Sequence, residues 1–271
     1  MDFAVTLLRA ALVVAALTAA VTIELLVRSR GRQGTTGGRP LNRWSRAAAA
    51  VGGAASILIA TVLNDTIDRA TGVDDLSMLL THLCGVVAVV GVQSLLVSWT
   101  YPPDARAGAL RLRFGGAGVV AAAAVIVFAL TSRSGIDLTN FYAHDVGVAE
   151  YLLIFDLYWA VTGVAIARNC IPLAIDNARA GQRRIATAQA LIAGGGVASG
   201  IWGITESAFV AATQFTGSAW DISAQEIISS SSAALFAVFL FSGIAASSIR
   251  STSRRRAPGA LRAEAQAGRR P

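Results

Sequence analysis

Seven long apolar stretches constrain the fold of this 271-residue chain more than any other feature. A helix needs about 20 apolar residues to cross the hydrocarbon core of a bilayer. The stretches that approach or exceed this length are 3–27, 47–63, 76–99, 114–131, 150–167, 185–213 and 225–249. Because every backbone polar group inside lipid must bond within its own segment, each stretch is predicted to be an α-helix. We therefore expect an all-α membrane protein, a seven-transmembrane-helix bundle in which residues 1–249 form one domain.

Composition agrees with this interpretation and removes several classes of protein. Only 14% of the residues are charged and the mean hydropathy is +0.58, which leaves too little polar surface for a water-soluble domain. All 23 basic residues are arginine, so the chain has no lysine for a retinal Schiff base or a P-loop. It has two histidines and two cysteines, too few for a histidine-rich metal site or a disulfide framework. We expect no cofactor.

The positions of the arginines predict how the chain is oriented. Twenty of the 23 lie after the first, third and fifth apolar stretches or in the tail 250–271. Because cytoplasmic segments are enriched in arginine, the N-terminus is predicted to lie outside and the C-terminus in the cytoplasm. The tail is basic and has no apolar period, so we predict a disordered segment near anionic inner-leaflet lipids. This bias accounts for the arginines without a nucleic-acid partner.

Acidic residues gather on the opposite side, which is predicted to be external. Asp65 and Asp68 are three residues apart, share a helix face and together form a possible outer cation cluster. The alternative is a plain polar cluster that ends the second apolar helix. Aromatic residues flank the spans at both interfaces, and Tyr151 and Trp220 are predicted to belong to the outer aromatic belt.

Ionisable residues inside the spans provide the main candidate site. Counted inward from the outer ends, Arg9, His82 and Asp156 lie about 10 Å below the outer boundary, and Glu206 lies about 12 Å below it. An arginine at this depth is costly without an anion, and the two acids are available to neutralise it. Such residues are expected to mark a functional site, since each must find a partner or water.

Each of the two acids shares a helix face with an aromatic ring. Trp159 lies one turn below Asp156, and Trp202 lies one turn below Glu206. We predict an outward-facing polar cavity with an aromatic floor, in which Arg9 pairs with one acid and the histidine exchanges protons. The alternative is a structural ion pair that holds the first, fifth and sixth helices together.

Small residues predict close helix packing in the second half of the chain. Gly196 and Gly200 form a GxxxG pair in the sixth stretch, and residues 229–232 of the seventh are all serine. Small side chains let the backbones of two helices approach, and hydroxyl groups hydrogen-bond across the interface. Packing is the expected role of both, with a polar pathway along the serines as the alternative.

Two segments resemble a known group of proteins. Residues 67–83 (IDRATGVDDLSMLLTHL) and 178–196 (ARAGQRRIATAQALIAGGG) are similar to a family of uncharacterised actinobacterial integral membrane proteins described as transporters or membrane regulators. The similarity extends over about two-thirds of the chain. The resemblance implies a multi-pass protein of a bacterial plasma membrane and brings no catalytic residues with it.

Three functions remain open from the sequence. The first is a transporter, or a transport component, for a small molecule or lipid. The second is a seven-helix receptor or regulator that senses an extracellular or membrane ligand, and it rests on analogy between folds. The third is an intramembrane enzyme, which lacks a recognisable motif, so we expect the protein not to be an enzyme. An oligomer or a partner subunit is compatible with each.

Overall fold

The protein is an all-helical, multi-pass membrane protein. The computed structural model describes residues 40–131, 147–217 and 220–248, and these contain six helices long and apolar enough to cross a membrane. The first predicted span, 3–27, and the tail 250–271 lie outside the described residues. The six described spans coincide with the last six apolar stretches of the sequence.

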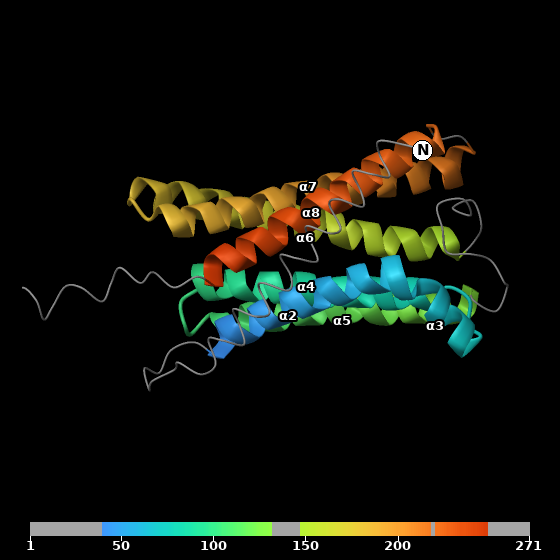
Figure 1. The fold of residues 1–271 in the computed structure, drawn as a ribbon, viewed down its shortest axis with the longest axis horizontal. Helices are drawn as coiled ribbons and strands as arrows, with labels where there is room; N and C mark the ends of the chain where they lie inside the picture. Colours follow the sequence, from blue (N-terminus) through green and yellow to red (C-terminus); the bar gives the residue numbers. More distant parts are fainter. Residues whose placement is uncertain (1–39, 132–146, 218–219, 249–271) are drawn as a thin grey trace, which may run out of the picture.

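The six spans form two groups of three (Figure 1). The first group comprises α2 (Pro40–Leu58), α4 (Leu76–Thr100) and α5 (Arg106–Thr131). The second comprises α6 (Val148–Arg179), α7 (Arg183–Thr216) and α8 (Ile222–Ser248). The two groups meet where α4 and α5 contact α6 and where α2 contacts α8. We call the end with the turn before α4 (residues 72–75) the acidic end, and the end with the α6–α7 turn the arginine end.

The second apolar stretch is the first half of a longer helix. After α2 the chain continues without a break through a π-helical turn, η1 (Ile59–Leu63), into α3 (Asn64–Thr71). The helix ends at Gly72, whose φ of 66° lets its N–H donate to the carbonyl of Asp68. The predicted end at residue 63 is therefore wrong. Polar residues continue a helix once it has left the hydrocarbon, where water satisfies the exposed side chains.

The fifth apolar stretch is also shorter than its helix. Helix α6 passes the predicted end at residue 167, includes Arg168 and Pro172, and continues to Arg179. Helices α6 and α7 have 32 and 34 residues, which correspond to about 48 and 51 Å. The hydrocarbon core is only about 30 Å thick. The α6–α7 hairpin is therefore long enough to extend beyond it, and at the arginine end it projects past the other helices (Figure 1).

Backbones approach closely where helices pack together, and small residues make this possible. A Cβ atom added at Gly203 of α7 would lie 2.4 Å from the Ala160 nitrogen of α6, and one at Gly196 would lie 2.8 Å from the Ala167 nitrogen. The packing role predicted for the GxxxG segment of α7 is confirmed. Helices α2 and α4 pack in the same way, because a Cβ at Gly91 would lie 2.5 Å from the Ala49 nitrogen.

Candidate functional site

A histidine–tyrosine pair joins α4 to α6 near the acidic end. The Nδ1 atom of His82 lies 2.7 Å from the phenolic oxygen of Tyr151. The imidazole also stacks on Phe155, one turn along α6, with ring centroids 3.7 Å apart and planes 21° apart. Tyr151 is fully buried, so its predicted place in the outer aromatic belt is wrong. Its ring packs between helices because the hydroxyl finds a partner there.

Aromatic rings continue from this pair toward the middle of the bundle. Phe155 meets Trp159 edge to face at a centroid distance of 5.7 Å, and Trp159 in turn lies 5.1 Å from Trp202 of α7. The indole N–H of Trp202 donates to the hydroxyl of Ser229 on α8, over 2.8 Å. Phe236 of α8 also meets Trp159, at a centroid distance of 5.0 Å, so four helices contribute to one aromatic cluster. Ser229 contacts that cluster as a hydrogen-bond acceptor.

The two predicted acids face each other across the α6–α7 contact. The side chains of Asp156 and Glu206 are 5% and 4% exposed, and they interact electrostatically. The backbone of Asp156 touches Gly203, one turn before Glu206, since a Cβ at Gly203 would lie 2.4 Å from the Asp156 carbonyl oxygen. Close approach of the two backbones therefore brings the two carboxyl groups together.

One of these carboxyl groups has an atom without a partner. Within the described parts of the chain, Oδ2 of Asp156 and the indole nitrogen of Trp159 are buried and make no hydrogen bond. Asp156 also interacts electrostatically with Tyr151, which in turn interacts with Asp75 in the turn before α4. Ionisable groups thus extend from the acidic end of the bundle to the α6–α7 contact. A buried acceptor without a partner is a place where a proton, a water or a polar ligand binds favourably.

Arg9 and the outer acids do not join this cluster in the described structure. Arg9 falls outside the described residues, so its pairing with an acid stays a prediction. Asp68 accepts hydrogen bonds from the backbone nitrogen and hydroxyl of Ser77, at 2.8 and 2.9 Å, and so caps the start of α4. Asp65 is exposed and lies 3.9 Å from Arg69 on the next turn. Both acids therefore have partners within the chain.

Sequence reasoning missed Tyr151 and Phe155 as members of the site. A usable signal was present, because Tyr151, Phe155 and Trp159 recur every four residues and so lie along one face of a helix. That face also borders Asp156. The missing information was which neighbouring helix this face meets, and the structure shows that it meets α4 at His82.

Comparisons with protein-family models, with curated proteins and with solved structures find no match to this chain. The functional interpretation therefore rests on the geometry of the site.

Proposed function

We propose that the protein is a plasma-membrane transporter for a small molecule, in which Asp156 binds and releases the coupling proton. The observation that carries this proposal is a carboxyl group that is 5% exposed, has one oxygen without a partner and lies beside a second buried acid. Two neighbouring carboxylates in a medium of low dielectric constant repel each other strongly. Uptake of a proton removes that repulsion, so protonation changes the electrostatic energy of the α6–α7 pair.

The coupling ion is assigned from the chemistry of the available donors. In residues 40–131, 147–217 and 220–248, no group of three or more His, Cys, Asp or Glu side chains converges. Divalent cations prefer six or more oxygen ligands, whereas a proton needs a single acceptor and a second oxygen to share it with. Asp156 and Glu206 supply such a pair.

A route for the proton begins at the acidic end. Asp75 lies in the turn before α4 and interacts electrostatically with Tyr151, which is hydrogen-bonded to His82 and also interacts electrostatically with Asp156. Histidine and tyrosine both donate and accept protons, so they are suited to relay one. We place this end outside the cell, in accordance with the arginine bias, and include the stretch 3–27 as a seventh span that carries Arg9 to the acids.

The experiment measures proton movement in purified protein. Wild-type protein in liposomes of equimolar phosphatidylcholine and phosphatidylglycerol, loaded with a pH-sensitive dye, should dissipate an imposed pH gradient faster than protein-free liposomes. Asp156→Asn and Glu206→Gln should abolish this excess rate while the melting temperature in detergent changes little. Glu226→Gln is the matched control, because Glu226 is exposed on α8 and loses the same charge.

The structural alternative gives the opposite pattern. If Asp156 and Glu206 serve only to hold helices together, both variants should melt at lower temperature and should leave the rate of gradient dissipation per folded molecule unchanged. That result would overturn the proposal.

A further inference from the structure

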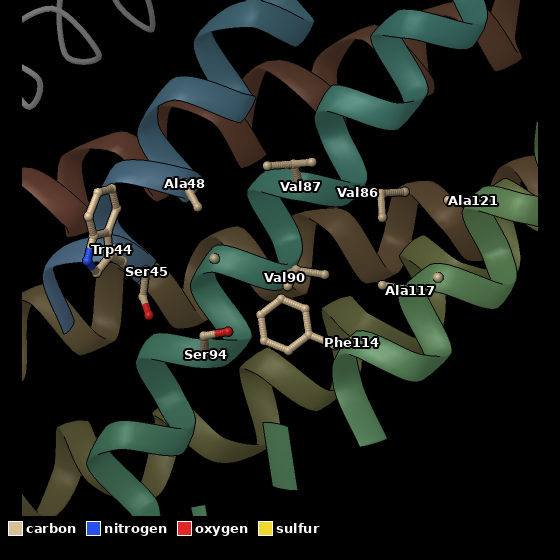
Figure 2. Close-up of a pocket in the computed structure, with 12 residues that line it drawn as sticks. Trp44, Ser45, Ala48, Val86, Val87, Val90, Ser94, Phe114, Ala117 and Ala121 are labelled. Carbon is tan, nitrogen blue, oxygen red and sulfur yellow. The ribbon is translucent and has the colours of Figure 1, made fainter. Parts of the chain in front are cut away.

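An apolar groove lies between the three helices of the first group, away from the acids (Figure 2). It has a volume of about 380 Å³, within the range of small-ligand sites. Its walls are formed by Trp44 and Ala48 of α2, Val87 and Val90 of α4, and Phe114 and Gly118 of α5. We call it the α2–α4–α5 groove. Asp156 and Glu206 lie on α6 and α7 and do not line the groove, so the inference does not rest on the proton site.

The groove opens toward the surroundings of the bundle. Val87 is 49% exposed and Phe114 is 54% exposed, although both are large apolar residues. In a membrane-spanning helix such faces meet acyl chains instead of water. Along α4 the lining extends from residue 86 to residue 94, about 12 Å in the direction of the membrane normal. The shape is that of a slot parallel to the lipid chains.

Glycine provides the width of the slot. A Cβ added at Gly118 would meet nothing within 4 Å, so the space beside this residue is open. Ser94 adds one polar atom, since its hydroxyl is buried, lines the groove and has no hydrogen-bond partner within the described residues. Figure 2 shows this hydroxyl directed toward the ring of Phe114, inside the groove.

Two arginines adjoin lining residues at the arginine end of the groove. Arg43 is next to Trp44 in the first turns of α2, and Arg113 precedes Phe114 on α5. The guanidinium of Arg113 donates to the Ala109 carbonyl at 3.0 Å and lies 5.4 Å from the centre of the Tyr101 ring, which fixes it at this end. Trp44 is 66% exposed at the same mouth, as is typical of tryptophan at the level of lipid headgroups.

We infer that the α2–α4–α5 groove binds one acyl chain of an anionic phospholipid whose phosphate is held by Arg43 and Arg113. The apolar walls match the chain, and the two arginines match the charge of the headgroup. A second copy of the protein is the competing occupant, because Gly116 on α5 also faces open space. The inference commits to the lipid, since arginines at one mouth complement a phosphate and have no counterpart on an apolar helix.

The test fills the groove without disturbing the helices around it. Gly118→Leu places a side chain in the open space of the groove. Gly116→Leu is the matched control, because Gly116 lies on the same helix, its Cβ would also meet nothing within 4 Å, and it does not line the groove. Each variant is purified from bilayer nanodiscs of equimolar phosphatidylglycerol and phosphatidylcholine, and retained lipid is counted by native mass spectrometry.

Wild type and Gly116→Leu should each retain one phosphatidylglycerol. Gly118→Leu should bind phosphatidylglycerol with an affinity about tenfold lower and should therefore lose it during purification. Arg43→Gln and Arg113→Gln should each weaken phosphatidylglycerol retention by about fivefold without affecting phosphatidylcholine. Arg183→Gln, at the exposed α6–α7 turn, should have no effect. Retention by Gly118→Leu equal to wild type would overturn the inference. So would equal retention of the two lipids by wild type, or a wild-type dimer that Gly118→Leu converts to a monomer.

Discussion

The phenolic oxygen of Tyr151 lies 2.7 Å from Nδ1 of His82, and this hydrogen bond ties α6 to α4 near the acidic end of the bundle. The first prediction follows from it. Tyr151→Phe keeps the ring contacts and removes the bond, so the free energy of unfolding in detergent should fall by about 1 kcal/mol. Tyr101→Phe, at the exposed arginine end, should leave the melting temperature unchanged. An equal response of the two variants would show that the pair contributes nothing to stability.

Two glycines of α7 should respond differently to the same substitution. Gly203→Ala places a Cβ atom 2.4 Å from backbone atoms of α6, so the helices must separate and stability should fall by about 2 kcal/mol. Gly200→Ala brings its Cβ only to ordinary contact, 3.5 Å from Val164, and should be neutral or stabilising by up to about 1 kcal/mol. Thermal unfolding of both variants in the same detergent checks this. A stable Gly203→Ala protein would show that α6 and α7 are not in backbone contact.

Substitution of the two acids of α3 should change the stability of the protein by different amounts. Asp68→Ala removes the hydrogen bonds to Ser77 at the start of α4 and should lower stability by about 1 kcal/mol. Asp65→Ala removes only an exposed pair with Arg69 and should change stability very little. Addition of Mg²⁺ to the wild type tests the outer cation cluster that the sequence suggested. A rise in melting temperature that both variants abolish would support a cation site there.

Asp221 should make the start of α8 sensitive to acid. Its carboxylate accepts hydrogen bonds from the backbone nitrogen and hydroxyl of Ser223 and from the Ala224 nitrogen, and these bonds lower the pKa of Asp221 below the usual 3.8. A lowered pKa in the folded state means that the stabilisation is complete above pH 3.8 and is lost as the pH falls through the folded-state value. The melting temperature of wild type should therefore exceed that of Asp221→Ala at neutral pH and approach it below pH 3.8. A difference that persists unchanged in acid would contradict the assignment.

Orientation can be tested by labelling single positions at the two ends. Asp74→Cys, in the exposed turn before α4, should react with a membrane-impermeant maleimide on intact cells. Ala180→Cys, in the exposed α6–α7 turn, should react only after the cells are permeabilised. Wild type gives the background from Cys84 and Cys170, which lie within helices. Labelling in the reverse order would invert the orientation inferred from the arginines.

The sequence was sufficient to predict the six described spans but not their full lengths. Hydropathy detects the part of a helix that lies in hydrocarbon, because the bilayer requires that part to be apolar. It does not detect Asn64–Thr71 or the last turns of α6 around Arg168, where the helix continues with polar side chains. Nor does it detect η1, because a π-helical turn depends on local backbone geometry and has no apolar period of its own.

The site was partly predictable for a related reason. Asp156, Glu206, Trp159 and Trp202 were found because ionisable and aromatic groups at one depth are rare, and the structure brings them together on α6 and α7. Tyr151 was assigned to an interface because tyrosine is common there. Whether Tyr151 is buried depends on how α6 is rotated about its own axis. Packing against α4 decides this rotation, and the apolar pattern of α6 alone does not predict it.

The backbone contact between α6 and α7 has a consequence for movement. Because helices in backbone contact through glycine have little room to slide, we expect α6 with α7, and α2 with α4, each to move as a unit. The seam between these units is lined by the stacked rings of His82 and Phe155, whose planes are 21° apart. His82 belongs to one unit, and Asp156 and Glu206 belong to the other. A displacement along the seam would therefore break and remake the His82–Tyr151 contact of the proposed relay without separating α6 from α7 or α2 from α4.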